Sequence, residues 1–340
     1  MYYFVFDMDE TIAELYSVFY FIASLRLRET LKESSLRHKL IISDSFERQI
    51  QRAYRYFVKR ILAEELSNKP LGILRPGIQD VMMELLHLKN KGIVKNVVIY
   101  SNNSHLQSLE FIRDLIHEYL GTDLIKDCIH WNHPMRGEEK IIGPGFSNKT
   151  WSVLKKIMIH GNCQVPAWIQ RDQVHFFDDL EHKDLKRELQ ENYHLVTPYN
   201  FKASFERISA IYKECIIEAG VDVNQLLDFV IQLLMDKEDI VLIDMDDELE
   251  SIVEMFHEKT RATVEINKTP PMWDSGVNRM MDVVEKVAKN ERTKERIPDR
   301  ESTKGGFSFR NRKRRRTRRK YHRRGSSQTN RKRQRTRRYL

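Results

Sequence analysis

The chain has 340 residues, of which 41% are hydrophobic, and this size suits two domains or one domain with appendages around a sizeable core. No apolar run approaches the ~20 residues that a membrane span needs, and the N-terminus lacks the basic segment of a signal peptide. Cys128, Cys163 and Cys215 show no CxxC spacing, which argues against a disulfide framework and against a zinc site. We therefore expect a protein of the nucleus or the cytoplasm with no membrane partner.

The net charge of +9 is concentrated in a basic tail, residues 310–340. The tail holds 17 of the 58 Lys and Arg residues and no Asp or Glu, so the rest of the chain has 41 basic against 49 acidic residues. A segment of this composition cannot build a core, and we expect residues 291–340 to be disordered. The partner of the tail is either a nucleic acid or an import receptor that reads basic clusters. Such tails also suggest a protein of a large DNA virus, acting in the infected cell.

The first elements expected are a strand and a long helical segment. Residues 2–6 are aromatic or β-branched and predict a buried strand that runs directly into Asp7 and Asp9. Residues 12–66 repeat apolar side chains at three- and four-residue spacing among many charges, which predicts helices. A further helix is expected to begin near Pro76.

Strands and helices alternate through the next part of the chain. The elements expected there, in chain order, are a strand at 97–100, a helix at 105–121, a strand within 127–134, a loop or hairpin at 135–148, a helix at 149–160, a strand at 174–177, a fifth strand within 193–200 and mainly helices at 204–290. This alternation predicts an α/β fold with a parallel, doubly wound sheet.

Polar residues follow three of the predicted strands. They are Asp7 and Asp9 after the first, Ser101 after the second, and Asp178 and Asp179 after the fourth. Open α/β sheets bind ligands at the carboxyl ends of their strands, so we expect these residues to converge. Adjacent carboxylates repel one another unless a cation or a shared proton intervenes, and Mg²⁺ prefers oxygen ligands. Lys149, at the start of a predicted helix, and Ser101 offer groups that suit phosphate oxygens.

Four motifs occur in the order typical of one enzyme superfamily. Residues 7–11 read DMDET, Ser101 follows a strand in IYSNN, Lys149 comes next, and Asp178 and Asp179 end FFDD. Together they resemble the haloacid dehalogenase (HAD) superfamily of phosphohydrolases over roughly residues 1–200. DMDET is also similar to the DLDET of the polymerase C-terminal-domain phosphatases, the NLI-interacting-factor-like branch.

The resemblance implies a Rossmann-like HAD core at 1–203 and a Mg²⁺-dependent phosphomonoester hydrolase. Asp7 is then the nucleophile that forms an aspartyl-phosphate, and Asp9 is the general acid for the leaving oxygen and later the base for water. The phosphoryl group is held by Ser101, Asn102 and Lys149. The implied metal ligands are Asp7, Asp9 through its backbone carbonyl, and Asp178 or Asp179.

The resemblance further implies a helical cap at 14–72, with 204–290 as a helical extension. The basic residues of the cap either face an anionic substrate or form a solvated helix face; they are Arg48, Arg52, Arg55, Lys59 and Arg60. Thr11 is expected to support the turn that carries the two aspartates rather than to react.

Two classes of function are compatible with the sequence. The first is a phosphatase for a phosphoprotein or a phosphate associated with nucleic acid, with small phosphometabolites as a further substrate class. The second keeps the HAD fold without its chemistry and uses the tail for nucleic-acid binding or scaffolding. A second pair of acids, Asp244 and Asp246, lacks the following threonine and is interpreted as solvated or as a dock for the tail. Lys140 and Lys155 are alternatives to Lys149 as the phosphate-binding lysine.

Overall fold

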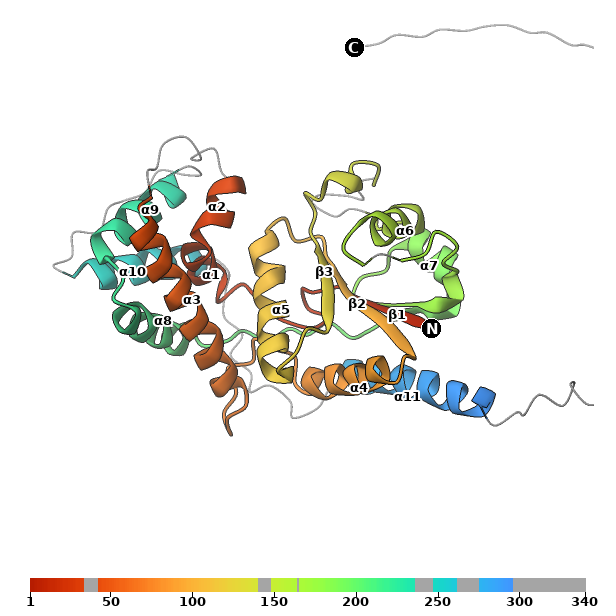
Figure 1. The fold of residues 1–340 in the computed structure, drawn as a ribbon. Coiled ribbons are helices and arrows are strands. Elements are labelled where there is room, and N and C mark those ends of the chain that lie inside the picture. The colour runs from red at the N-terminus through yellow and green to blue at the C-terminus, as the bar shows by residue number, and fades with distance from the viewer. Residues whose placement is uncertain (34–41, 140–147, 164, 236–246, 262–274, 296–340) are drawn as a thin grey trace, which may run out of the picture. The chain divides into compact units, whose positions relative to one another are not determined.

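A five-stranded, fully parallel sheet organises the fold (Figure 1). The structure is a computed structural model, and it describes residues 1–33, 42–139, 148–163, 165–235, 247–261 and 275–295. The strands are β1 (Tyr2–Phe6), β2 (Val94–Tyr100), β3 (Ile125–Ile129), β4 (Val174–Asp178) and β5 (Tyr193–Leu195). Their order is β3-β2-β1-β4-β5, so the chain builds outward from β1 first on one side and then on the other. This confirms the parallel α/β sheet predicted from the sequence.

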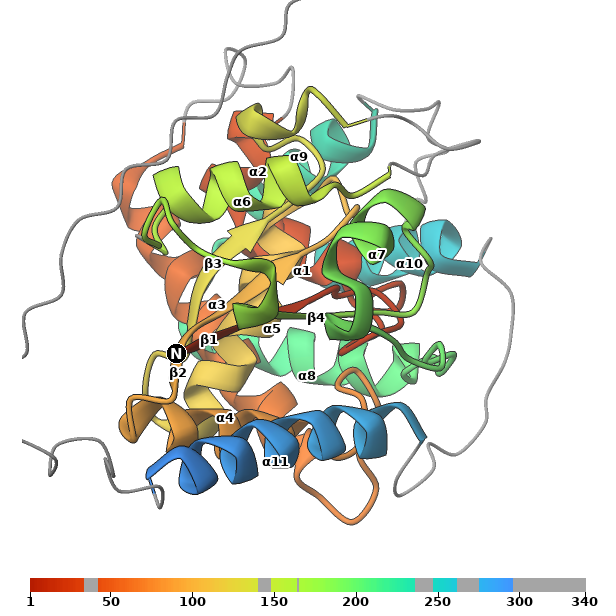
Figure 2. The same ribbon diagram turned by 90° about the vertical axis from the view of Figure 1, so that its right-hand side faces the viewer.

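Helices cover both faces of the sheet (Figures 1 and 2). In β1, Phe4 and Phe6 belong to the core on one face, while Tyr3 and Val5 belong to the core on the other. A strand buried on both faces needs apolar residues at successive positions, which explains the uninterrupted apolar run. The helices are α4 (Ile78–Asn90) and α5 (Leu106–Leu120) on the first face, with α11 (Ser275–Glu295) along α4, and α6 (Trp151–His160) and α7 (Lys183–Leu189) on the second.

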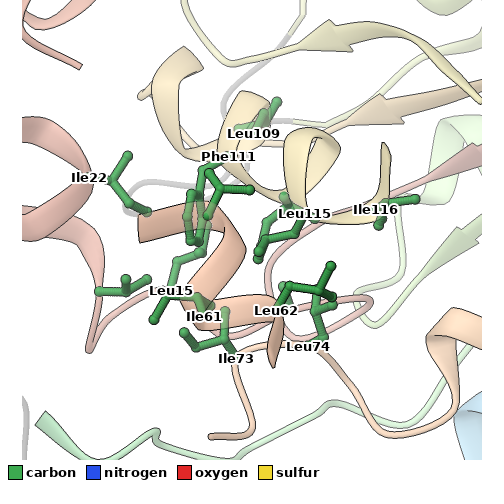
Figure 3. Close-up of a cluster of buried hydrophobic side chains, with 14 of the residues drawn as sticks. Leu15, Ile22, Ile61, Leu62, Ile73, Leu74, Leu109, Phe111, Leu115 and Ile116 are labelled. Atoms are coloured by element: carbon green, nitrogen blue, oxygen red, sulfur yellow. The ribbon is translucent and has the colours of Figure 1, made fainter. Parts of the chain in front are cut away.

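A group of helices packs against α5 on the side away from the sheet (Figure 1). Its members are α1 (Phe19–Leu25), α2 (Leu27–Glu33), α3 (Asp44–Glu65), α8 (Phe205–Ala219), α9 (Val223–Met235) and α10 (Glu248–Arg261). Figure 3 shows Ile61 and Leu62 of α3 close to Phe111 and Leu115 of α5. The helices of residues 14–72 and those of 204–290 thus share one core and belong to one unit, Met1–Arg296.

The N-terminal helical segment begins later than expected. Its first helix starts at Phe19 rather than at Ile12. The chain from Ile12 is held in an extended path, because the Arg75 N–H donates to the Ile12 carbonyl (3.0 Å) and the Glu14 N–H donates to the Ile73 carbonyl (2.8 Å). Tertiary pairing therefore overrides the helical pattern at these positions.

Two other boundaries also differ from the prediction. The third strand ends at Ile129, because the His133 N–H donates to the His130 carbonyl (3.1 Å) and turns the chain. At the other end of the chain, α11 runs to Glu295, beyond the expected start of disorder at residue 291. Its last turns are stabilised within the helix, for instance by the ion pair of Lys289 with Glu285 (3.0 Å).

Cys128, Cys163 and Cys215 are buried and free, as expected. Within the described residues, no helix has the length and apolar character to cross a membrane. The short 3-10 turns are Pro134–Arg136, Arg171–Gln173 and Gln190–Asn192. The basic tail, Asp244, Asp246 and Lys140 lie outside the described residues.

Candidate active site

The two aspartates of DMDET lie in a tight turn at the carboxyl end of β1. The Asp7 N–H donates to the carbonyl of Phe177 in β4 (2.8 Å), which places Asp7 between the ends of the two strands. The carbonyl of Met8 accepts N–H groups from Thr11 (3.2 Å), Ile12 (3.0 Å) and Ala13 (3.1 Å), and this closes the turn. At Glu10 the turn needs the left-handed backbone (φ 56°), an uncommon conformation for a residue other than glycine.

A buried arginine holds this turn in place. Arg75 is fully buried, and its guanidinium donates to the carbonyls of Glu10 (3.3 Å), Thr11 (2.9 Å) and Thr197 (2.5 Å). Three carbonyl partners from two loops compensate the burial of the charge. Arg75 therefore fixes the loop that carries Asp7 and Asp9 without reaching the site itself.

Lys149 is brought between two of the predicted aspartates. Its Nζ donates to Asp7 Oδ1 (2.6 Å) and to Asp178 Oδ2 (2.8 Å), and all three side chains are buried. Lys149 immediately precedes Thr150, the N-cap of α6, whose hydroxyl accepts the Val153 N–H (3.4 Å). The structure thus brings together Asp7 and Asp178, which were expected to converge at one sheet edge, and adds Lys149 between them.

The charges of this triad shift one another's pKa values. Burial works against the charged form of Lys149, but Asp178 and Asp7 outweigh it and raise the pKa of the lysine. Burial likewise works to raise the pKa of Asp178, but Lys149 and His182 lower it. For Asp7, burial together with the charge of Asp178 raises the pKa against the opposing effect of Lys149. The His182 Nε2 lies 3.3 Å from Asp178 Oδ2, a neighbour that the sequence did not indicate.

Three carboxylates form a group that suits a metal ion. Asp7, Asp178 and Asp179 each offer an oxygen, and these oxygens lie within 4.8 Å of one another. The Thr11 hydroxyl bridges to Asp179, donating to its Oδ1 (3.0 Å) and accepting its N–H (3.0 Å). Burial and the charges of Asp7 and Asp178 raise the pKa of Asp179 to about 7. Crowded oxygen ligands whose negative charges repel one another fit a hard divalent cation such as Mg²⁺.

The two acids of FFDD have different surroundings. Asp178 is fully buried and is held by Lys149 and by the Leu180 N–H (2.8 Å). Asp179 instead lines a cavity of about 530 Å³ at this edge of the sheet. Asp179 is thus the more accessible of the two to a ligand in the cavity.

Asp9 is hydrogen-bonded to residues that follow β2. Its carboxylate accepts the Ser101 hydroxyl (3.2 Å) and the Asn103 amide (3.3 Å to Oδ2). Burial and the charge of Asp7 raise the pKa of Asp9 to about 7, although both hydrogen bonds oppose the rise. Asn103 was not predicted, and its place in the SNN run after a strand is the one signal that could have indicated it. Its side chain is oriented by the His105 N–H, which donates to Asn103 Oδ1 (2.8 Å).

A second buried arginine holds the loop after β2. Arg136 donates to the Ser101 carbonyl, to Asn102 Oδ1 (2.7 Å) and to Glu139 Oε2 (2.7 Å). Glu139 in turn accepts the Tyr100 hydroxyl and the N–H of Thr150 at the start of α6. This network connects the loop of Ser101 with the helix that follows Lys149, so both sides of the site are fixed relative to each other.

The cavity joins the predicted residues to others that sequence reasoning missed. The predicted residues in its lining are Asp7, Asp9, Ser101, Asn102, Lys149 and Asp179. The lining also contains Tyr16, Phe19, Tyr20 and His105, together with Lys259 and Thr260 from the end of α10. No motif or local periodicity marks Lys259, because only tertiary packing brings α10 to this place.

The basic residues of the predicted cap are not in the lining of the cavity. Arg48, Arg52, Arg55 and Lys59 of α3 are exposed, and Arg60 donates to Glu214 and to Glu218 (2.6 Å) of α8. This supports the solvated-face interpretation over contact with an anionic substrate. Of the two described candidates for the phosphate-binding lysine, Lys149 lines the cavity and Lys155 does not.

Comparisons with known proteins returned no matching family model, curated protein or solved structure. Function therefore has to be inferred from the geometry and the electrostatics of this site.

Proposed function

We propose that the chain is a Mg²⁺-dependent phosphomonoester hydrolase with an HAD-type active site and an aspartyl-phosphate intermediate. The observation that carries the proposal is the contact of Lys149 with both Asp7 and Asp178 beside the cavity. These residues come from three distant segments, and they meet in the order and at the sheet edge that the HAD resemblance implies.

In the proposed reaction Asp7 is the nucleophile and Asp9 is the general acid and then the general base. The Asp7 carboxylate, oriented by Lys149, attacks phosphorus, forming a bond from its oxygen to phosphorus while the bond to the leaving oxygen breaks. Asp9, with a pKa of about 7, is partly protonated at neutral pH and donates its proton to that leaving oxygen. The ionised Asp9 then takes a proton from water, which hydrolyses the aspartyl-phosphate and releases inorganic phosphate.

The charge balance of the cavity supports a metal-dependent reaction. Four acids line it, Asp7, Asp9, Glu10 and Asp179, against two lysines, the buried Lys149 and Lys259 of α10. A phosphate dianion would be repelled by such a lining unless further positive charge were present. Mg²⁺ held by Asp7 and Asp179, with Asp178 behind them, would supply that charge and polarise the phosphoryl group.

Two parts of the chain indicate which substrates it binds: the helices around the cavity, and the basic tail. The lining residues Tyr20 and Lys259 belong to the helical group of α1–α3 and α8–α10, and Tyr16 lies just before α1; we propose that this group acts as the cap. The basic tail, residues 310–340, favours a substrate on nucleic acid, either a phosphoprotein bound there or a phosphate of the polynucleotide itself. An import receptor remains a second partner for the same tail.

Hydrolysis of p-nitrophenyl phosphate by the full chain with Mg²⁺ tests the proposal. Asp7→Asn is expected to abolish turnover, and Asp9→Asn to reduce it by roughly 10²–10⁴-fold, the range for a general acid. Asp172→Asn, at an exposed position before β4, is the matched control and keeps full activity. Undiminished turnover in Asp7→Asn contradicts the proposed nucleophile.

The alternative function, a binding protein without catalysis, is favoured by the tail alone. It predicts salt-sensitive binding of nucleic acid with no turnover of any phosphate ester. Deleting residues 305–340 distinguishes the two functions. If the chain is a phosphatase, the shortened chain still hydrolyses p-nitrophenyl phosphate but no longer binds polyanions. Loss of both on this deletion contradicts the division between a catalytic body and a binding tail.

A further inference from the structure

The cavity is larger than the phosphoryl site requires. Asp7, Lys149 and Asp179 are only three of the residues that line a volume of about 530 Å³, which is in the range of pockets that hold a drug-sized ligand. Other lining residues are of a different kind, and we call Tyr16, Phe19, Tyr20 and Lys259 the second wall: three aromatic rings and a lysine. The composition of this second wall indicates what the leaving group carries.

The second wall has an aromatic surface. Tyr16 lines the cavity and is 56% exposed, although its neighbours Leu15 and Ser17 are buried. The Phe19 ring lies 4.5 Å from the His105 ring and 5.1 Å from the Tyr20 ring, centroid to centroid, which fixes its orientation. Aromatic rings that are exposed beside a cavity are suited to stacking against a flat ring of a ligand.

A cation is anchored beside these rings. Phe256 of α10 is fully buried and packs on Tyr20 (5.9 Å) and on Phe21 (5.2 Å) of α1, ring centroid to ring centroid. Lys259 follows Phe256 by three residues and therefore projects from the same side of α10. Lys259 is itself a lining residue of the cavity, so the lining holds a second lysine besides Lys149, a residue type that binds anionic groups.

We propose that the substrate is a nucleotide that carries a second phosphate, with the base against Tyr16 and Phe19 and the second phosphate at Lys259. This inference rests on the proposed function, because it places the scissile phosphate at Asp7. A flat ring and two phosphates match the aromatic wall, the Lys259 charge and the phosphoryl end. Nucleoside bisphosphates and the phosphorylated end of a polynucleotide share this chemistry, and the arginine-rich tail favours the polynucleotide as the source.

Selectivity of turnover tests the inference. We expect kcat/KM to be higher for adenosine 3′,5′-bisphosphate and for an oligonucleotide with a terminal phosphate than for glycerol phosphate or a phosphotyrosine peptide. Tyr16→Ala and Lys259→Ala are each expected to lower the ratio of nucleotide to glycerol phosphate turnover by about 10-fold, the effect of one lost stacking or charged contact. Tyr16→Phe and Lys259→Arg are expected to preserve the ratio.

Controls outside the cavity are available for both substitutions. Trp168→Ala removes an exposed aromatic ring (67% exposed) and Lys289→Ala removes an exposed lysine of α11, and neither residue lines the cavity. Both are expected to keep the wild-type ratio. A higher kcat/KM for the phosphotyrosine peptide, or an unchanged ratio in Tyr16→Ala and Lys259→Ala, overturns the nucleotide assignment while leaving the phosphatase proposal intact.

Binding to the Asp7→Asn variant separates this inference from the proposed function. Calorimetry with adenosine 3′,5′-bisphosphate should show binding that weakens about 10-fold in the double variants Asp7→Asn/Tyr16→Ala and Asp7→Asn/Lys259→Ala. If wild-type protein hydrolyses no phosphate ester yet this pattern is seen, the phosphatase fails and the ligand assignment holds. Absence of binding, or binding equal in all three variants, overturns the assignment.

Discussion

Replacing Lys149 by methionine tests the electrostatic basis of the site through stability rather than through turnover. Methionine has a similar length without the charge, so the substitution leaves Asp7 and Asp178 buried without their shared cation. Breaking a buried ion pair by removing one partner costs roughly 3–5 kcal/mol, because the remaining charge is buried and uncompensated. The Lys149 side chain is 1% exposed and has two carboxylate partners at 2.6 and 2.8 Å, so we expect a loss in this range.

The matched control is Lys156→Met, seven residues further along the chain and within α6. Lys156 also forms an ion pair, with Glu138 (3.3 Å), but its side chain is 46% exposed. Exposed pairs contribute about 0–1 kcal/mol, so the control should change stability little. Urea unfolding of the full chain at pH 8, without divalent cations and followed by tryptophan fluorescence, measures both losses.

The pH dependence of the stability loss and a second substitution, Asp178→Asn, provide two further tests. Without Lys149, Asp7 and Asp178 gain a higher pKa in the folded state than in the unfolded state, so the loss of stability should be larger at pH 8 than at pH 5. Asp178→Asn added to Lys149→Met should recover part of the loss, because one uncompensated charge is gone. Equal losses for Lys149→Met and Lys156→Met, or no recovery in the double variant, would refute the reasoning.

Three further predictions concern the fold. Burial raises the pKa of Glu65 to about 7 from 4.5, so the contribution of Glu65 to stability is present below about pH 4.5 and is lost as the pH rises through 7. In urea unfolding, Glu65→Gln should therefore reduce the fall in stability between pH 5 and 8 by roughly 2.5 kcal/mol, and an unchanged fall contradicts this. A Cβ on Gly276 would lie 2.2 Å from Nη2 of the buried Arg75, so Gly276→Ala should cost roughly 1–3 kcal/mol, while Gly137→Ala, with no atom within 4 Å, should cost far less. Deleting residues 297–340 should leave the thermal midpoint unchanged, because the unit that folds is Met1–Arg296, and a fall of several degrees argues otherwise.

The sheet and the acidic centre of the site could be predicted because local signals specify them. Buried parallel strands read as apolar runs, and Asp7, Asp178 and Asp179 stand directly where such runs end. The rule that ligands lie at the carboxyl ends of strands then brings them together without knowledge of the remaining packing. Lys149 was predictable through its place at the start of a helix and through the HAD resemblance.

The supporting residues could not be predicted, because their roles depend on contacts between distant segments. Arg75 and Arg136 look like ordinary surface arginines in sequence, yet both are buried and bind backbone carbonyls that no local pattern reveals. Tyr16 precedes α1 and Lys259 lies in α10, and the positions of these two helices are decided by the joint core of α1–α3 with α8–α10. The same core displaced the expected start of the first helix, because residues 12–14 pair with a segment some 60 residues later.

The order in which the helices are synthesised has a consequence for folding on the ribosome. The apolar face of α4 is covered by Val277, Met280 and Val284 of α11, and α3 is covered by α8, each about 140–200 residues later in the chain. A nascent chain therefore carries uncovered apolar helices until nearly all of the body has been translated. Polypeptides released before α11 is complete present surfaces that recruit chaperones and promote aggregation.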